Sequence, residues 1–329
     1  MSKKIIFHCG SAKTGSTSIQ AQLMADPEYL AVHGAYYCPR MVRAGNIDPL
    51  NIAIRDVRNP KKRAKAVAAG RARLDELFQE KGFDTVILSN ESAFGDPFND
   101  QVVGFFPLLA PAIEGLKAMF EGHWVIPVFF IRSQAALIPS FYGQRVRQGA
   151  GYHLSEFSEK ISAYDLSWRP IIEGVSSSFH GAPVEVHQFE HFTGDAHAYT
   201  AKLFSRLLGF DLAAEGKEIT KNRTAKSHAL GIMRFINRLV ENLPLIRPHK
   251  EHVIKKRIRR RLFPFVESLK TGKKLSLPEA ETEQLEQIYS ADIQALSIKK
   301  GPVQENRPED TCHKQVQGTN LFAGSIQPL

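Results

Sequence analysis

"HCGSAKTGSTSIQ", residues 8–20, is the stretch that decides the fold. A nucleotide-phosphate loop has the pattern G-x-x-x-x-G-K-[ST], and Gly10 and Gly15 keep the spacing of its two glycines. The lysine of that pattern is displaced, because Ser16 occupies its position and Lys13 lies inside the loop. Which anion such a loop binds depends on what the displaced lysine reaches.

The residues on either side of this loop predict a strand before it and a helix after it. KKIIFHCG (3–10) is a short apolar run typical of a buried strand, and residues 16–24 have the pattern of a helix. Strand, glycine-rich turn and helix, in this order, form the context in which a loop binds phosphate.

Three further apolar runs predict strands: FDTVILSNE (83–91), HWVIPVFFIRS (123–133) and PVEVHQFEHF (183–192). The first two follow helix-like segments, so parallel crossover units fit better than hairpins. We therefore expect an α/β fold of the phosphate-loop type, with three layers and a mostly parallel central sheet flanked by helices.

Beyond about Phe192 the chain is rich in helix signals, with apolar residues three and four positions apart. The segments are AYTAKLFSRLLGF (198–210), SHALGIMRFINRLVENL (227–243), KEHVIKKRIRRRLFPFVESL (250–269) and PEAETEQLEQIYSADIQALS (278–297). We expect these helices to cover the sheet and the mouth of its site, within one domain that spans residues 1–300. The tail, 301–329, lacks periodicity and is expected to be loosely ordered.

Composition sets limits on function. The chain has 329 residues, is 43% hydrophobic and carries a formal charge of +9, which favours a globular protein with anionic partners. Cys9, Cys38 and Cys312 are far apart, so they suggest neither a disulfide framework nor a zinc site. The N-terminus has no signal-peptide pattern, and the apolar run at 124–131 is too short to span a membrane. We expect a soluble, cytoplasmic protein.

The displaced lysine points to a specific chemistry. Backbone N–H groups along the loop and the positive end of the following helix can hold a 5′-phosphate. The residues in question are Ser11, Ala12, Lys13, Thr14, Gly15, Ser16 and Thr17, of which Ser16 and Thr17 add hydroxyl donors. Lys13 projects from the crown of the loop, where it can touch the outer group of a short anhydride and the bridging oxygen that gains charge as the bond breaks. This arrangement suits sulfuryl transfer.

These residues resemble the sulfotransferases that use 3′-phosphoadenosine 5′-phosphosulfate (PAPS). GSAKTGSTS, from Gly10 to Ser18, is similar to the family's 5′-phosphosulfate loop. A strand that ends in arginine, with a serine eight residues later, is the family's second signature, and Arg132 and Ser140 match it. The resemblance implies that these two bind the 3′-phosphate of the donor, which suits a guanidinium and a hydroxyl.

The likeness extends, more weakly, to about residue 300, and it includes bacterial, carbohydrate-type members of the family. Family members often have an acidic residue and a proline after the arginine, whereas this chain has Ser133 and Gln134. Arg223 and Lys226 are candidates for the family's later basic loop.

Glu91 is the candidate base. An acceptor hydroxyl loses its proton as it attacks, and Glu91 ends a predicted strand, where an open parallel sheet places its site. In carbohydrate sulfotransferases a glutamate often has this role, and SNES (89–92) resembles that segment. Alternatively, Glu91 caps the next turn or pairs with Lys13. His8 is more consistent with a packed core histidine, and the other histidines lack metal-ligand spacing, so no metal is expected.

The sequence thus predicts a sulfotransferase that moves a sulfuryl group from PAPS to an acceptor hydroxyl, with a carbohydrate or glycolipid as the acceptor. One alternative is a magnesium-dependent kinase or nucleotidase with a degenerate loop. Another is a non-catalytic protein that binds polyanions or a membrane surface through its charge and the run KKRIRRR (255–261). That run otherwise reads as a solvated helix face.

Overall fold

The computed structural model carries side chains and describes most of the chain. The described residues are 3–40, 47–99, 101–179, 184–192, 195–213, 226–242, 251–268 and 272–296. Arg223 and the tail, 301–329, lie outside them, so the expectations for these residues are not addressed by the structure.

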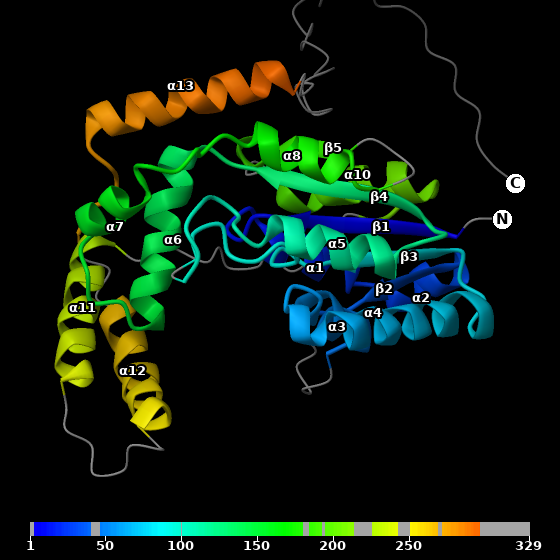
Figure 1. Ribbon diagram of the computed structural model, residues 1–329, viewed down its shortest axis with the longest axis horizontal. Coiled ribbons are helices and arrows are strands. Elements are labelled where there is room, and N and C mark those ends of the chain that lie inside the picture. Colours follow the sequence, from blue (N-terminus) through cyan, green and yellow to red (C-terminus); the bar gives the residue numbers. More distant parts are fainter. Residues whose placement is uncertain are drawn as a thin grey trace, which may run out of the picture. The chain divides into compact units, whose positions relative to one another are not determined.

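A five-stranded parallel sheet forms the centre of the described chain (Figure 1). Its order is β2-β3-β1-β4-β5, and each strand is parallel to its neighbours in the sheet. The strands are β1 (Lys4–Gly10), β2 (Ala35–Cys38), β3 (Thr85–Ser89), β4 (Trp124–Ile131) and β5 (Glu185–Gln188). The predicted α/β class and the presence of the four predicted strands are confirmed, and β2 was not predicted. The fourth strand is shorter than the predicted run 183–192, because Phe189–Phe192 form the short helix α9.

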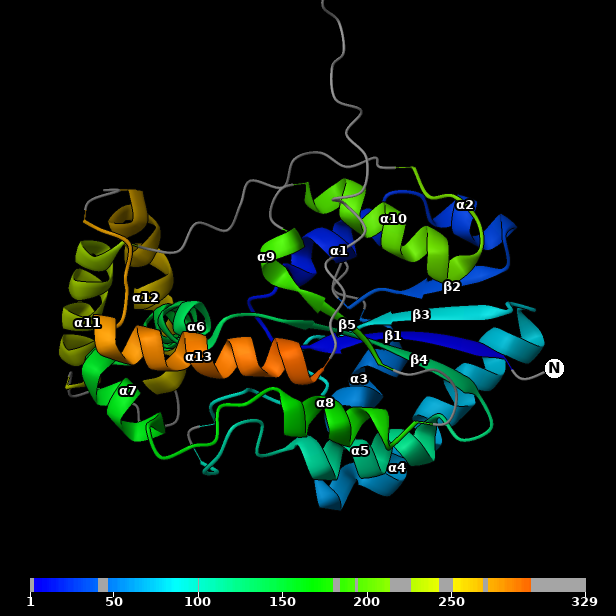
Figure 2. The ribbon, with the colours of Figure 1, turned by 90° about the horizontal axis from the view of Figure 1, so that it is seen from above.

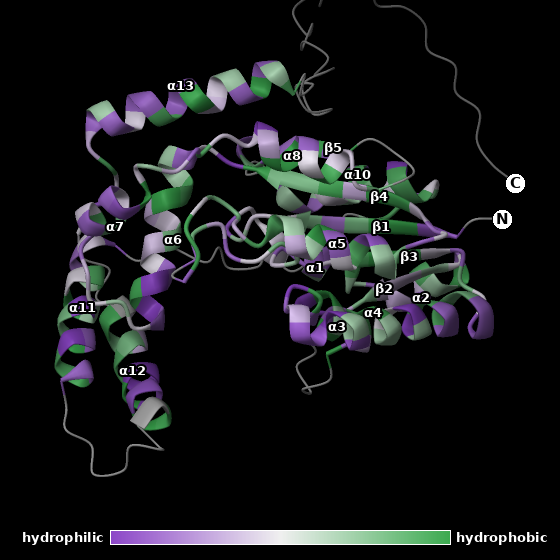
Figure 3. Cartoon of the chain, viewed as in Figure 1, coloured by the Kyte–Doolittle hydropathy of each residue, from purple (hydrophilic) through white to green (hydrophobic). Residues whose placement is uncertain are grey.

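Helices cover both faces of the sheet, so the fold has three layers (Figure 2). One face carries α1 (Ser16–Leu23), α2 (Pro27–Val32) and α10 (Ala196–Leu208). The other face carries α3 (Pro49–Asp56), α4 (Pro60–Asp75), α5 (Leu109–Met119) and α8 (Arg169–Ser176). The helix α4 continues directly into η1 (Glu76–Glu80). Side-chain alternation along β1 explains this, because Ile5 and Phe7 join one buried cluster and Ile6 joins the other. Figure 3 shows the apolar character of β1 and β4 between these layers.

The order of the strands fixes where a site can form. Since β1 lies between β3 and β4, the chain moves to one side of β1 and later crosses to the other, which makes a topological switch point. In the register, Gly10 is opposite Phe130, and Ile131 is opposite Gln188. The carboxyl ends of β1, β4 and β5 therefore meet at one edge.

A second group of helices extends beyond this carboxyl edge (Figure 1). It consists of α6 (Gln134–Gln148), α7 (Leu154–Ile161), α11 (Ser227–Glu241), α12 (Glu251–Ser268) and α13 (Glu279–Ala295). Asn237 of α11 donates hydrogen bonds to the carbonyls of Val146 and Ala150 at the end of α6, at 2.7 and 2.8 Å. The expectation that α11 and α12 cover the sheet is therefore wrong, because they pack against α6 and against each other. No described helix combines the length and the apolar character needed to cross a membrane.

Asp292 anchors α13 to the rest of the described chain. It is 3% exposed, and its carboxylate accepts the backbone N–H of Trp168 at 2.8 Å and the hydroxyl of Ser167 at 2.5 Å. The side-chain amide of Gln134 donates to the same carboxylate at 3.3 Å. One carboxylate thus joins α13 to the N-termini of α8 and α6.

We predict that Asp292→Ala lowers the free energy of unfolding by about 3 kcal/mol, since it leaves several buried donors without an acceptor. Urea denaturation measures this change. Gln287→Ala on the exposed side of the same helix is the matched control and is expected to have an effect within about 0.5 kcal/mol. Equal effects of the two substitutions would contradict the anchoring role.

Candidate anion-binding site at the carboxyl edge of the sheet

The loop between β1 and α1 is tied together by its own hydroxyl groups. The Thr14 hydroxyl donates to the carbonyl of Ser11 at 2.6 Å, and the Ser11 hydroxyl donates to the carbonyl of Ala12 at 2.9 Å. Both of these side chains are fully buried. Ser11 and Thr14 therefore shape the loop with their side chains, and what they can offer to a ligand is their backbone N–H groups.

Two residues of the loop have left-handed backbone conformations, Lys13 with φ 75° and Gly15 with φ 82°. A Cβ atom at Gly15 would lie 2.3 Å from Cε1 of Phe192, which packs directly against this turn. Glycine is thus required at position 15 for two reasons, conformation and space. Lys13 carries the strain of a left-handed non-glycine residue, a feature that clusters at functional sites.

The first turn of α1 has no side-chain cap. Gly15 is the N-cap and supplies no side-chain hydrogen bond to the helix end. The early N–H groups of a helix carry partial positive charge and have no acceptor within the helix. Ser16 is buried and Thr17 is exposed, so of the two predicted hydroxyl donors Thr17 is the more accessible.

Arg132 lies against this loop, although it is far away in sequence. Its Nη1 donates to the carbonyl of Lys13 at 2.9 Å, and its guanidinium lies over the ring of Phe189, 4.8 Å from the centroid. The indole N–H of Trp168 donates to the Arg132 carbonyl at 2.9 Å. The Nε atom of Arg132 is buried and has no hydrogen-bond partner among the described residues. The structure thus brings together the two positions that carry the sequence signatures.

Positive charge surrounds the Lys13 ammonium. Burial lowers the pKa of Lys13, and the charges of Arg147 and Arg132 lower it further. Within the described part of the chain, no carboxylate forms an ion pair with Lys13. The charges of Arg147 and Arg132 make the ammonium form of Lys13 costly in the absence of an anion, although Glu190 acts on Arg132 with the opposite sign.

Ser140 is not hydrogen-bonded to Arg132. It lies on α6, on a half-buried stripe that also holds Ala136, Gln144 and Arg147, whereas Phe141 and its neighbours on the other face are buried. Arg147 follows Ser140 by seven residues, two helical turns, and so it projects from the same side of α6. Sequence reasoning missed Arg147, and this spacing is the signal that would have found it.

Glu91 lies beside α1 and is held by two partners. Arg40, which follows β2, forms an ion pair with its Oε1, and the amide of Gln20 donates to its Oε2 at 3.0 Å. Gln20 is in the second turn of α1, which places Glu91 beside the start of that helix. The alternative in which Glu91 pairs with Lys13 is wrong, because Arg40 takes that place.

The departure from the family pattern after Arg132 has a structural counterpart. Ser133 is the N-cap of α6, and its N–H donates to Oε1 of Glu190 at 3.1 Å. The other oxygen of Glu190 accepts the hydroxyl of Tyr289 at 2.7 Å. A carboxylate from elsewhere in the chain thus supports the helix start, where family members often have an acidic residue in sequence.

His8 is packed in the core, as its position on the first strand suggested. It is fully buried, and its Nδ1 lies 2.8 Å from the hydroxyl of Ser89. The ring of Phe130 separates it from His187, whose Nδ1 lies 2.7 Å from the hydroxyl of Tyr199. Burial lowers the pKa of each histidine to about 4, although Glu91 and Glu185 respectively oppose the shift.

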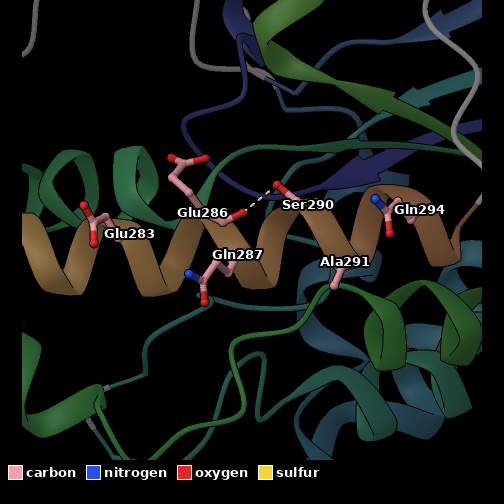
Figure 4. Close-up of a pocket in the computed structure, with 6 residues that line it drawn as sticks. All are labelled: Glu283, Glu286, Gln287, Ser290, Ala291 and Gln294. Carbon is pink, nitrogen blue, oxygen red and sulfur yellow. Dashed lines mark hydrogen bonds between the residues drawn. The ribbon is translucent and has the colours of Figure 1, made fainter.

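Two hollows in the described part of the chain are lined by residues outside the loop. One lies along α13, lined by Glu283, Glu286, Gln287, Ser290, Ala291 and Gln294 (Figure 4). The other lies between α6, α7 and α13, with Ile138, Leu154 and Leu285 in its lining. The candidate site is marked by its charge and by the conformation of the loop. The described residues contain no cluster of three or more side chains suited to hold a metal ion.

Comparison of the sequence with protein-family models and with curated proteins finds no significant match. The resemblance to sulfotransferases therefore rests on the residues of this chain alone.

The buried histidines predict how stability depends on pH. Their folded-state pKa of about 4 lies below the value near 6.5 of an unfolded chain, so the unfolded state binds more protons between these values. Stability is then complete above about pH 6.5 and is lost as the pH falls toward 4. We predict that His8→Gln reduces the loss between pH 7 and pH 5 by on the order of 1–2 kcal/mol, and that adding His187→Gln reduces it further.

Urea denaturation across this pH range measures how the free energy of unfolding changes with pH. Each variant is compared with its own value at pH 7, so a difference in overall stability does not affect the result. If the free energy of unfolding falls equally with pH in the wild type and in both variants, these histidines do not cause the loss of stability in acid.

Proposed function

We propose that this protein is a sulfotransferase that moves the sulfuryl group of PAPS to an acceptor hydroxyl on a carbohydrate or a glycolipid. The observation that carries the proposal is the Lys13 ammonium, held on a strained loop beside Arg132 and Arg147 without a carboxylate partner among the described residues. Such a position is stabilised by a bound anion and is otherwise costly.

In this proposal the donor lies across the carboxyl edge of β1 and β4. Backbone N–H groups from Ser11 to Thr17 bind the 5′-phosphate, together with the positive end of α1. Arg132 binds the 3′-phosphate through guanidinium N–H groups that are not used for the Lys13 carbonyl. Ser140 completes this clamp from the half-buried stripe of α6.

The reaction is an in-line displacement at sulfur. The acceptor oxygen forms a bond to sulfur while the bond from sulfur to the 5′-phosphate oxygen breaks, and that oxygen leaves with the electron pair. Lys13 stabilises the negative charge that develops on the leaving phosphate. Glu91 takes the proton of the acceptor hydroxyl, which approaches Oε2 in place of the Gln20 amide.

The magnesium-dependent alternative draws less support. It needs a carboxylate whose negative charge attracts the metal, whereas the ion pair with Arg40 already neutralises the charge of Glu91. A polyanion-binding protein without catalysis would not need a strained lysine at the crown of the loop. Two separate signatures that meet at one edge favour a specific nucleotide.

Calorimetric titration without metal tests the class of donor. We predict that 3′,5′-diphosphoadenosine binds, and that AMP and ATP bind at least tenfold more weakly, because they lack the 3′-phosphate that Arg132 recognises. Adding magnesium leaves this order unchanged. Preference for ATP with magnesium would instead favour the kinase alternative.

The strain at Lys13 allows stability and function to be separated. We predict that the free energy of unfolding of Lys13→Gly equals that of the wild type or exceeds it by up to about 1 kcal/mol, since glycine adopts the left-handed conformation without strain. The same substitution lowers sulfuryl transfer by about 10²–10³-fold. Lys13→Met, which removes the same charge and keeps the strain, is the matched control: we expect an equal loss of activity and a lower stability than that of Lys13→Gly. Wild-type turnover in either variant would exclude the proposed role.

Glu91→Gln is expected to separate chemistry from donor binding. The amide keeps the shape of the side chain but does not accept a proton, so we predict a loss of about 10²–10⁴-fold in turnover with an unchanged affinity for 3′,5′-diphosphoadenosine. Exposed Glu173→Gln on α8 serves as the control. A parallel loss of nucleotide affinity in Glu91→Gln would indicate a structural role through Arg40.

A further inference from the structure

The helix pair α11 and α12 exposes an unusual amount of apolar surface. Six of the fourteen exposed large apolar side chains in the described residues lie on these two helices. They are Ile232, Phe235, Leu239, Val253, Leu262 and Phe265. Phe235 is 63% exposed and Phe265 is 69% exposed, so both rings face solvent.

On α11 these residues form a second apolar face. Ile232, Phe235 and Leu239 follow each other at helical spacing on one side, whereas Met233 and Val240 are buried on the other. A helix at a domain surface normally has one apolar face, which packs on the core. The described residues provide no cover for the second face.

The exposed surface of α12, the helix that packs against α11, is strongly cationic. Within the run 255–261, Lys255 and Arg259 bind α11: Lys255 donates to the carbonyl of Glu241 at 2.9 Å, and Arg259 donates to Oδ1 of Asn237 at 2.9 Å. The cations of the run that face solvent are Lys256, Arg257, Arg260 and Arg261. The interpretation of the whole run as a solvated helix face therefore needs correction, since part of it is structural.

We propose that the α11–α12 pair rests on the surface of an anionic lipid bilayer. Phe235, Leu239 and Phe265 enter the boundary between headgroups and acyl chains, and Arg260 and Arg261 bind lipid phosphates. Exposed aromatic and aliphatic side chains next to a cluster of arginines are the combination that such a surface stabilises. Long arginine side chains can bury their stems while their charges stay at the headgroups.

The charge of the exposed surface favours an anionic bilayer over a second copy of the chain. A symmetric contact brings the same patch of both copies together, so the exposed cations would face each other. Like charges at such a contact oppose association, whereas anionic lipids attract it. A nucleic acid would satisfy the cations but would leave the apolar side chains without a partner.

The pair lies beyond the carboxyl edge of the sheet, the edge that carries Lys13 and Glu91 (Figure 1). Contact with a bilayer would therefore bring that edge toward acceptors held in the membrane. This last link rests on the proposed function and favours a glycolipid acceptor; the bilayer contact itself does not depend on it.

Sedimentation of the full-length protein with vesicles tests the contact. We expect binding to vesicles of phosphatidylglycerol mixed with phosphatidylcholine, little binding to phosphatidylcholine alone, and weaker binding as salt is raised. The assay involves no turnover and no nucleotide, so its result is independent of the sulfotransferase proposal. Absence of binding, or equal binding to both kinds of vesicle, would overturn the inference.

Paired variants separate the two contributions. Arg260→Gln with Arg261→Gln is expected to reduce vesicle binding about fivefold for each charge removed. Phe235→Ser with Phe265→Ser is expected to reduce it at least about tenfold. The controls are Lys61→Gln with Lys65→Gln for charge and Val32→Ser with Val103→Ser for apolar surface, since all four positions are exposed elsewhere. Control variants that lose binding equally would also count against the inference.

Size-exclusion chromatography of the same variants distinguishes the other occupants. A dimer that dissociates in Phe235→Ser with Phe265→Ser, without vesicle binding by the wild type, would show that a second copy covers this face. Binding to polyphosphate or RNA that survives the loss of both phenylalanines, again without vesicle binding, would assign the surface to polyanions. Either result would overturn the proposal.

Discussion

The placement of β1 between β3 and β4 is the constraint on which the candidate site depends. All three strands are parallel, so their carboxyl ends open onto one edge. The residue that follows each end then has a fixed neighbourhood: Lys13 lies in the loop after β1, Glu91 follows β3, and Arg132 follows β4. These three residues are far apart in sequence, so the sheet is what brings them to the same edge. Hydrogen bonds of the sheet, which the chain needs in order to fold, also assemble the charges.

At this edge aromatic packing stabilises the loop, whereas the electrostatic repulsion between its cations destabilises it. The buried ring of Phe192 packs against Gly15, and the half-buried ring of Phe189 lies against the Arg132 guanidinium. Burial at this edge raises the free-energy cost of holding Lys13 and Arg132 as cations, a cost that Glu190 offsets only for Arg132. Proteins keep such arrangements where a ligand supplies the missing charge. On the opposite flank, Arg40 already neutralises Glu91, so the two halves of the site differ in charge balance.

The sequence predicted the layers of the fold well and the partners of individual residues less well. The four predicted strands are apolar runs bounded by turns, and their burial between helices follows from that pattern. The strand β2 (Ala35–Cys38) has four residues and two tyrosines, so neither its length nor its alternation gave a signal. Arg40 was missed for the same reason, because its position beside Glu91 depends on that strand. Helical periodicity in α11 and α12 showed that one face is buried, but periodicity does not say against what; Asn237 selects α6 through two carbonyls.

The short helix α9 (Phe189–Phe192) has a mechanical consequence for the whole edge. Its four residues touch three different parts of the described chain: Phe192 packs under Gly15, Phe189 lies under Arg132, and Glu190 accepts hydrogen bonds from Ser133 and Tyr289. It also follows directly on β5, which pairs with one strand only, at the end of the sheet. These contacts make α9 the common neighbour of the loop, the start of α6 and α13. A ligand that displaced the loop would therefore also act on the hydrogen bonds that Glu190 accepts from α6 and α13.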